Sequence, residues 1–222
     1  MMPSSTGRFL TFEGIDGTGK STQARLLAER LRAEGYTVLL TREPGGTPVG
    51  RHIRALLLDS AHGDLVPKAE LLLFLADRLQ HLHQVIRPAL ARGEWVISDR
   101  YHDATLAYQQ FARGLDVQPL ADFMAQEVDK PWLTLWLDLP LEVALQRISQ
   151  RQTTPENPAP DTPPALDESR LEADVDFLRR VQQGYAALAQ RDPARMVRVD
   201  ASPSPEAVAA AVYQVWQSKQ GV

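Results

Sequence analysis

Near the start of the chain, residues 13–22 (EGIDGTGKST) have the composition of a phosphate-binding loop. A glycine, four intervening residues and then Gly-Lys-Ser is the spacing that cradles nucleotide phosphates. Glycines let backbone N–H groups converge on an anion, a lysine neutralises the outer phosphates, and a serine hydroxyl can ligate Mg²⁺. We therefore expect the following residues to bind a nucleoside triphosphate: Gly14, Ile15, Asp16, Gly17, Thr18, Gly19, Lys20, Ser21 and Thr22.

The segments on either side of this loop support that interpretation. Residues 9–12 are apolar and β-prone, and residues 21–34 carry apolar side chains at helical spacing before Gly35. The loop would thus lie between a strand and a helix N-terminus, whose free donors and positive dipole end favour an anion. The alternative is an ordinary glycine-rich turn with a solvated lysine, which the flanking strand and helix disfavour.

Polar residues also follow two other strand-like runs. Arg42 comes after residues 37–41, and Asp99 and Arg100 come after residues 95–98. In a doubly wound sheet the carboxyl ends of the strands face the ligand crevice, so these side chains are candidates for a second phosphate site and for Mg²⁺. Arginine donates in a fork that a lysine cannot reproduce. The alternative is that Asp99 and Arg100 form only internal ion pairs.

Two helical segments carry candidate groups for a nucleoside. Phe74 and Arg78 are four residues apart and share a helix face, where a ring can stack on a base and a guanidinium can donate to its carbonyl. Thr105, Tyr108 and Gln109 share a face of the next helix and offer a hydroxyl, a flat ring and an amide. Taken alone, Phe74 is far better explained as a core residue than as a ligand-binding residue.

The elements that position these residues alternate along the chain. Strand-like runs lie at 9–12, 37–41, 95–98, 133–138 and 196–200. The predicted helices between and after them are 21–34, 47–58, 67–88 with a kink or break near Pro88, 102–111, 119–128, a helix from 140 through 147, 171–188 and 205–216. Such alternation predicts an α/β fold with a parallel sheet and helices on both faces.

Composition narrows the class of protein. A chain of 222 residues with 44% hydrophobic content fits one globular domain. The net charge of −4 does not favour a nucleic-acid-binding surface, and the lack of cysteine excludes disulfides and thiolate metal sites. We expect no membrane span, because no run of about 18 uncharged apolar residues occurs. A cytoplasmic location is the expectation.

Several blocks of the sequence, taken together, resemble thymidylate kinases. They are EGIDGTGKST, TREPGGT (41–47), LFLADR (73–78), ISDRYHDATLAYQ (97–109) and LDESRLE (166–172), in that order. The resemblance runs from about residue 9 to residue 200. It implies a five-stranded parallel sheet in a P-loop nucleoside monophosphate kinase fold, as a single kinase domain over 1–222 with a lid segment at about 147–171. It also implies phosphoryl transfer from Mg·ATP to dTMP in dTTP biosynthesis, and a homodimer.

The resemblance also assigns roles to the candidate residues. Arg42 and Arg100 would grip the dTMP phosphate, and Ser21 and Asp99 would serve Mg²⁺. Phe74 would stack on the base of the acceptor nucleoside, Arg78 would reach an exocyclic oxygen, and Thr105 would contact the base edge. Tyr108 would lie at the 2′ position, Asp16 near the 3′-hydroxyl, and Gln109 in the pocket wall.

The sequence departs from the family pattern in two places. Some thymidylate kinases carry an arginine inside the phosphate-binding loop, where this chain has Gly17-Thr18. Bacterial-type relatives instead place basic residues in the lid, which implies that Arg147, Arg151 or Arg170 joins Lys20 and Arg100 in catalysis, with Arg151 and Arg170 preferred. The second departure is the proline-rich stretch 153–164, which we expect to form a loop between two helices.

Two other functions remain open at this point. A kinase for a different nucleoside or nucleoside monophosphate would share the fold, although two arginines at strand ends favour an acceptor that already carries phosphate. A P-loop switch or assembly ATPase would hydrolyse ATP without an acceptor. The Asn-Lys-x-Asp motif of GTP-binding switches does not occur in the sequence.

Overall fold

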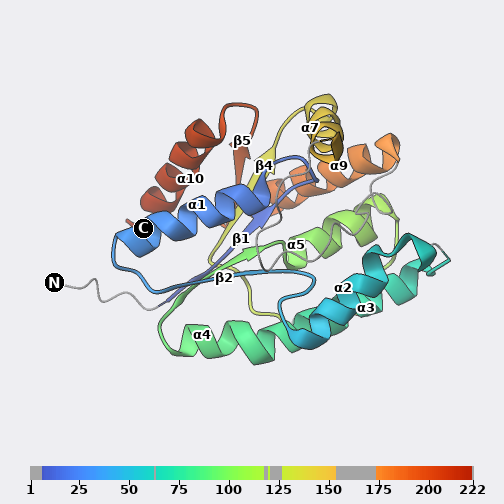
Figure 1. The fold of residues 1–222 in the computed structure, drawn as a ribbon, viewed down its shortest axis with the longest axis horizontal. Helices are drawn as coiled ribbons and strands as arrows, with labels where there is room; N and C mark the ends of the chain where they lie inside the picture. Colours follow the sequence, from blue (N-terminus) through green and yellow to red (C-terminus); the bar gives the residue numbers. More distant parts are fainter. Residues whose placement is uncertain (1–6, 63, 118–119, 121–126, 154–173, 222) are drawn as a thin grey trace.

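Five parallel strands form one sheet at the centre of the protein (Figure 1). The computed structural model describes residues 7–62, 64–117, 120, 127–153 and 174–221. The strand order is β2-β3-β1-β4-β5, and the strands are β1 (Phe9–Glu13), β2 (Val38–Arg42), β3 (Trp95–Asp99), β4 (Leu133–Asp138) and β5 (Met196–Asp200). The predicted α/β class is confirmed, and each predicted strand lies within one residue of the observed one.

Helices connect the strands. They are α1 (Lys20–Ala33), α2 (Pro48–Leu58), α3 (Pro67–His81), α4 (Arg87–Ala91), α5 (His102–Thr105), α7 (Leu141–Thr153), α9 (Val175–Arg191) and α10 (Pro205–Gln220). A 3₁₀ turn, η1 (Ser60–His62), follows α2. The prediction of a helix at 119–128 falls almost wholly outside the described residues, as does the proline-rich loop.

Alternating side chains of the strands place helices on both faces of the sheet. Leu10 and Ile97 pack in the large core cluster with residues of α1 and α10, which lie side by side (Figure 1). Phe9 and Val96, the neighbours of those residues, pack instead with Ile86 and Ala89 at the other face. Strands buried on both faces read as continuous apolar runs, which is why their bounds were predictable.

The long helix that was predicted to kink near Pro88 continues through two changes of pitch. α3 runs into a π-helical segment, η2 (Leu82–Ile86), and α4 follows with Pro88 in its first turn. A proline lacks the N–H of a regular helix and is tolerated at a helix start, so the wider turn before it accommodates the residue. A second π-helical segment, η3 (Leu106–Ala112), extends α5.

The carboxyl ends of the strands meet at one edge of the sheet. Asp99 pairs in register with both Phe12 and Arg42, and Glu13 pairs with Trp136. All of the predicted strand-end residues therefore lie along the same crevice. Within the described residues, no helix is long and apolar enough to cross a membrane.

Candidate active site

The phosphate-binding loop connects β1 to α1 as predicted. Gly17 and Gly19 have positive φ angles of 81° and 88°, and a Cβ on Gly17 would lie 2.5 Å from the carbonyl oxygen of Ala144. Only glycine fits such a position without strain. Gly19 caps the N-terminus of α1, so the free N–H groups of the first helical turn open into the loop.

Lys20 lies inside the loop and is 5% exposed. Its Nζ donates to the carbonyl oxygen of Ile15 at 2.8 Å and lies 3.2 Å from Oδ1 of Asp16. The Thr18 hydroxyl donates to the same carbonyl at 2.8 Å. The ammonium is therefore held within reach of the space that the loop surrounds, where phosphates would lie.

Ser21 and Asp99 form a pair that fits the predicted Mg²⁺ role. The Ser21 hydroxyl donates to Oδ2 of Asp99 at 2.5 Å. The other carboxylate oxygen of Asp99 is buried and has no hydrogen-bond partner among the described residues. Mg²⁺ in phosphoryl-transfer sites takes one or two protein oxygens plus phosphates and waters, so this hydroxyl and this orphaned oxygen suit it. The described residues contain no larger cluster of metal-ligating side chains.

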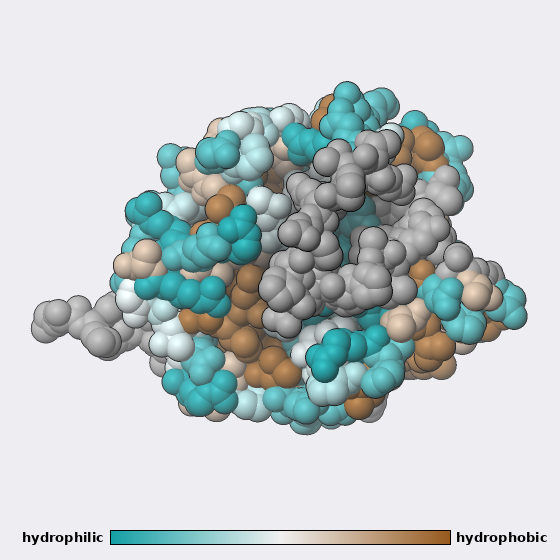
Figure 2. All heavy atoms as spheres, viewed as in Figure 1, coloured by the Kyte–Doolittle hydropathy of each residue, from teal (hydrophilic) through white to brown (hydrophobic). Residues whose placement is uncertain are grey.

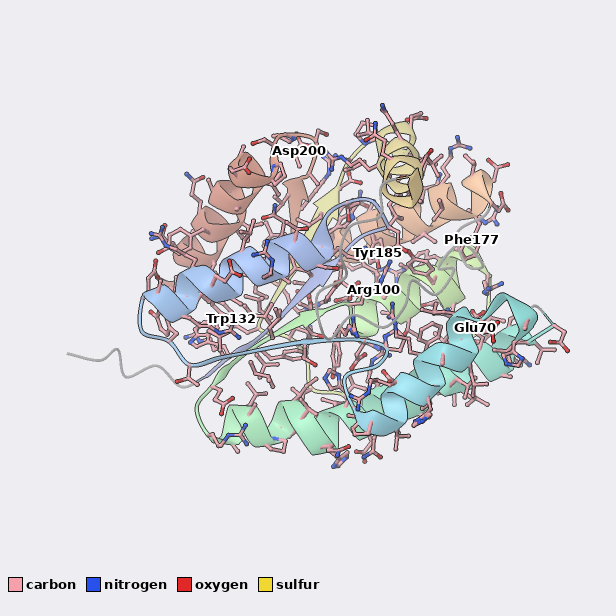
Figure 3. The ribbon with its side chains drawn as sticks, viewed as in Figure 1. Glu70, Arg100, Trp132, Phe177, Tyr185 and Asp200 are labelled. Carbon is pink, nitrogen blue, oxygen red and sulfur yellow. The ribbon has the colours of Figure 1, made fainter. Side chains whose placement is uncertain are left out.

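Arg100 connects the phosphate-binding loop to the neighbouring pocket (Figure 3). One terminal nitrogen donates to the carbonyl oxygen of Gly14 at 3.0 Å. The other donates to Oδ1 of Asp16 at 2.5 Å and to the Tyr108 hydroxyl at 3.2 Å. Burial opposes ionisation of Asp16, but the charges of Arg100 and Lys20 outweigh it and hold the pKa of this carboxyl below its ordinary value. Asp16 is thus an anion that orders two cations.

Arg78 projects from α3 into a buried cluster of polar groups, the candidate acceptor pocket. It is 2% exposed, and its Nε donates to Oε2 of Glu43 at 2.9 Å. Its terminal nitrogens donate to the Thr105 hydroxyl and to the carbonyl oxygen of Tyr101, each at 2.9 Å. Arg78 and Thr105, which were predicted separately as acceptor-binding residues, are therefore in contact. Phe74, one turn earlier on α3, is half-buried.

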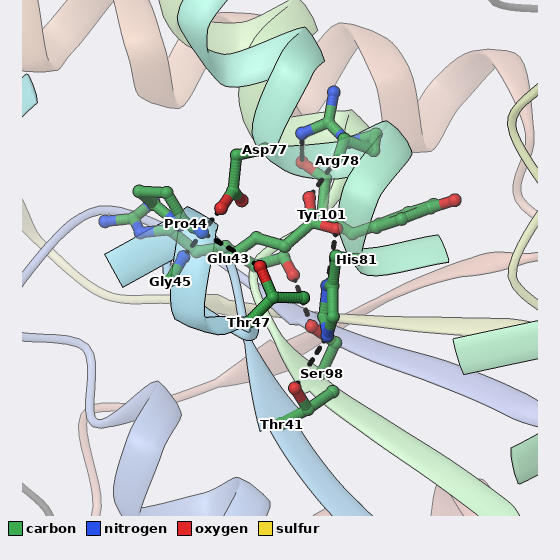
Figure 4. Close-up of polar contacts among 12 residues, drawn as sticks. Thr41, Glu43, Pro44, Gly45, Thr47, Asp77, Arg78, His81, Ser98 and Tyr101 are labelled. Carbon is green, nitrogen blue, oxygen red and sulfur yellow. Dashed lines mark hydrogen bonds and ion pairs between the residues drawn. The ribbon is translucent and has the colours of Figure 1, made fainter. Parts of the chain in front are cut away.

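Glu43 is the centre of the network that holds this pocket (Figure 4). Its second oxygen lies 2.8 Å from Nδ1 of His81, and the opposite ring nitrogen of His81 lies 2.7 Å from the Thr41 hydroxyl. Oδ1 of Asp77 accepts from the Gly45 N–H at 3.0 Å. Burial and the nearby Glu43 carboxylate raise the pKa of Asp77 to about 6. The TREPGGT loop is therefore joined to α3 by buried ionisable groups.

The far wall of the pocket comes from η3. Tyr108 and Gln109 are 6% and 2% exposed. The Gln109 amide donates to Oε1 of Glu70 at 3.2 Å, and Arg113 donates to both carboxylate oxygens of Glu70 at 2.9 Å. Thr105, Tyr108 and Gln109 are thus all buried, and the prediction that they share one acceptor-binding face stays a prediction.

Arg42 is the last residue of β2, opposite Asp99 in register, and is half-buried. Its position at the crevice agrees with a role in phosphate binding, which stays a prediction. Arg151 is in α7, but its side chain lies outside the described part of the structure. Arg170 also lies outside it, with the part of the predicted lid segment from residue 154 to residue 171, so the preferred lid arginines remain predictions.

Arg147 occupies a different place from the other candidates. It donates to the carbonyl oxygens of Ala201 and Ser202 at 3.0 and 3.2 Å. With Gly17, Gly19 and Val208 it lines a cavity of about 400 Å³ that adjoins the phosphate-binding loop. In the observed conformation Arg147 lines this cavity, and its predicted catalytic role stays a prediction.

Sequence reasoning missed four residues of the site. Glu13 and Glu43 each stand at or just after a strand end, before a glycine-containing loop, and that position could have identified them. His81 continues the spacing of Phe74 and Arg78 on α3. Tyr185 belongs to the buried face of α9, and nothing in the sequence separates it from core residues.

Comparison with known proteins identifies the family. A family model described as thymidylate kinase matches residues 12–212. The chain is 49% identical to the thymidylate kinase of Synechococcus sp. (strain JA-2-3B'a(2-13)) over 93% of both chains. It is 46% identical to that of Desulfovibrio desulfuricans (strain ATCC 27774 / DSM 6949 / MB) over 90% of both.

A solved structure agrees with these sequence relatives. The crystal structure of thymidylate kinase from Ehrlichia chaffeensis superposes with a TM-score of 0.73 and 32% identity, covering 95% of this chain and 98% of that one. The resemblance inferred from the sequence blocks and the predicted kinase fold are thus confirmed, and the chain belongs to the thymidylate kinase family.

Proposed function

We propose that this protein transfers the γ-phosphoryl group of Mg·ATP to dTMP, which yields ADP and dTDP for dTTP biosynthesis. One observation carries the assignment beyond family membership. Arg100 contacts a carbonyl of the phosphate-binding loop through Gly14 and the wall of the neighbouring pocket through Tyr108. A donor phosphate and an acceptor phosphate would therefore meet at a single guanidinium.

The chemistry needs little covalent work from the protein. Charge spreads over the oxygens of the transferring group, so positioned cations and N–H donors supply most of the catalysis. Lys20 and the N-terminus of α1 would hold the donor phosphates, and Arg42 and Arg100 would hold the acceptor phosphate. Ser21 and Asp99 would hold Mg²⁺, which would supply positive charge to the phosphates.

The buried pocket beneath α3 would select the acceptor base. Arg78 offers N–H donors to a base carbonyl, and Thr105 lies within hydrogen-bond distance of the same guanidinium. Phe74 would stack on the ring, Gln109 would line the pocket, and Tyr108 would crowd the 2′ position, which favours deoxyribose. Asp16 would approach the 3′-hydroxyl.

Three further assignments belong to this proposal. Residues 1–222 would act as one kinase domain, in which the segment 147–171 closes over ATP and excludes water.

The chain would act as a homodimer. In support, α2 and α3 expose Val49, Leu56 and Leu72, and Figure 2 shows hydrophobic surface in the region of these helices. The cytoplasmic location stays a prediction.

The proposal is tested by ADP formation from Mg·ATP with a panel of acceptors. The panel holds dTMP, dUMP, UMP, dCMP, AMP, dGMP and thymidine, with a reaction lacking any acceptor as the control. We expect strong turnover with dTMP and little with the others. Preference for another acceptor would overturn the pocket assignment, and equal ADP release without an acceptor would favour a switch-type ATPase.

A further inference from the structure

Arg100 has an unusual backbone conformation for its residue type. Its φ is 69°, and in the described part of the chain no other residue except glycine has a positive φ. The left-handed conformation is unfavourable for an L-residue other than glycine. The turn follows the end of β3 directly and directs the side chain across the phosphate-binding loop toward Gly14. A conformation of this kind persists only where its surroundings hold it.

Hydrogen bonds hold the peptide groups on both sides of this turn. The Arg100 N–H donates to the carbonyl oxygen of Phe12 at 2.9 Å, and the Arg100 carbonyl accepts from the Ser98 hydroxyl at 2.8 Å. The next N–H, that of Tyr101, donates to Oε1 of Glu13 at 2.8 Å. Two of these three bonds therefore come from the end of β1, one from a main-chain carbonyl and one from a carboxylate.

The second oxygen of Glu13 connects the same carboxylate to the Arg100 side chain. Oε2 accepts from the Tyr185 hydroxyl at 2.9 Å, and that hydroxyl lies 3.5 Å from a terminal nitrogen of Arg100. Glu13 and Tyr185 are both fully buried, and the Tyr185 ring stacks on Trp136. One carboxylate thus supports the strained backbone through one oxygen and the guanidinium through the other.

We propose that Glu13 and Tyr185 are positioning residues that fix Arg100, backbone and side chain together, in the conformation that receives the acceptor phosphate. Both residues are sealed from solvent, so they act through Arg100 rather than on the substrate. This inference rests on the proposed function only for the identity of the acceptor.

The electrostatics of Glu13 agree with this arrangement. Burial and the Asp103 carboxylate raise the pKa of Glu13 to about 7, whereas the Arg100 charge and the hydrogen bonds from Tyr185 and Tyr101 oppose that rise. Arg100, Tyr185 and Tyr101, the groups that the Glu13 carboxylate orders, therefore stabilise its ionised form. Removal of the Tyr185 hydroxyl or of the Glu13 carboxylate leaves the remaining polar groups buried without a hydrogen-bond partner.

The experiment compares Tyr185→Phe and Glu13→Gln with the wild-type protein. The control is Tyr213→Phe, because the Tyr213 hydroxyl also donates to a carboxylate, Glu34, at 2.6 Å, but on the distant helix α10. dTMP affinity is measured by titration calorimetry and the KM values for dTMP and ATP by steady-state kinetics. Loss of one hydrogen bond corresponds to about three- to tenfold. We expect Kd and KM for dTMP to rise by this factor in Tyr185→Phe, with KM for ATP within twofold.

A double-mutant cycle separates positioning from general damage. In an Arg100→Ala background, Tyr185→Phe should no longer change the Kd for dTMP, because the residue through which it acts is gone. A persistent effect in that background would overturn the proposal, as would equal rises in both KM values. Wild-type affinity in Tyr185→Phe would also overturn it.

A second measurement needs no substrate. We expect amide hydrogen exchange at Arg100 and Tyr101 to be at least about tenfold faster in Glu13→Gln and Tyr185→Phe than in Tyr213→Phe. Unchanged exchange would refute the positioning role whatever the acceptor is. If the wild-type protein binds no dTMP but exchange accelerates as expected, the proposed acceptor is wrong and the positioning role stands.

Discussion

The phosphate-binding loop and the pocket beneath α3 hold charge in different ways. The loop works mainly with backbone N–H groups, shaped by Gly17 and Gly19 at the start of α1. The pocket works with side chains, because Glu43, Arg78 and His81 are all buried and contact one another. In the loop, function and stability can therefore be separated by mutation. In the pocket they cannot, because each charge is the partner of another.

Glu43→Ala is the strongest test of the pocket. Removal of the carboxylate leaves Arg78 buried without its ionic partner, and such losses cost about 3–5 kcal/mol of unfolding free energy. Urea denaturation measures the change. Glu29→Ala is the control, since the Glu29 side chain is 52% exposed and its ion pair with Arg25 contributes little. A loss below about 1 kcal/mol would show that the pocket does not depend on this ion pair.

Lys20→Ala tests the opposite behaviour of the loop. Removal of a cation beside the transferring phosphoryl group should lower kcat by on the order of 10²-fold or more. The urea midpoint should change far less than in Glu43→Ala, because the loop is held by its backbone. Lys68→Ala, on the exposed surface of α3, is the control. A loss of less than about threefold in kcat would count against the role of Lys20.

Arg42→Lys tests whether phosphate binding at the crevice between the two regions requires the paired N–H donors of a guanidinium. A lysine keeps the charge but binds a phosphate through one point, so we expect KM for dTMP to rise about tenfold while KM for ATP stays similar. Arg51→Lys, at an exposed position of α2, provides the matched control. Unchanged dTMP kinetics would remove Arg42 from the acceptor site.

Tyr108→Ala tests whether the Tyr108 ring selects deoxyribose over ribose in the acceptor. With the ring removed, the preference for dTMP over ribo-TMP should fall several-fold, because a hydrophobic contact of this kind contributes only about 1–3 kcal/mol to discrimination. Tyr108→Phe keeps the ring and should retain the preference. The ratio of kcat/KM values for the two acceptors is the measurement, and a ratio that stays fixed in Tyr108→Ala would exclude crowding at the 2′ position.

The pH dependence of stability tests the buried carboxylate of Glu13 without any substrate. The pKa of Glu13 rises from 4.5 to about 7 on folding, through burial and the Asp103 carboxylate. The folded protein therefore binds more protons than the unfolded chain between these values, and this group lowers stability as pH increases from about 4.5 to about 7. Glu13→Gln should remove that contribution, so the difference in unfolding free energy between variant and wild type should change across this range. A constant difference would contradict the raised pKa.

The two regions also differ in how much the sequence reveals. Glycine spacing is local information, and it predicted the loop together with Lys20 and Ser21. Apolar runs predicted the strands to within one residue. The pocket depends on contacts between distant segments, since Arg78 meets Glu43 and Thr105 across 35 and 27 residues of chain. The spacing on α3 singled out Arg78, whose role in base recognition stays a prediction. It did not indicate Glu43, which holds Arg78, or His81, which holds Glu43.

The π-helical segments were missed for a different reason. An i→i+5 turn leaves no periodic pattern of its own over a few residues, so 102–111 was predicted as an ordinary helix and Pro88 as a kink. Thr105, Tyr108 and Gln109 are nevertheless all buried, and their role in acceptor binding stays a prediction.

The π-helical winding of η3 makes the placement of Tyr108 and Gln109 depend on the number of residues in this segment. A π-helical segment is equivalent to one residue inserted into an α-helix. Deletion of Leu106 or Ala107 would restore the tighter winding and bring Tyr108 and Gln109 one position closer to Thr105 along the chain. Thr105 and Tyr108 would then be two residues apart instead of three, although all three side chains would still be present in the chain. In descendants of this protein, substitutions here can be absorbed one at a time, whereas a single-codon deletion would change the acceptor site at once.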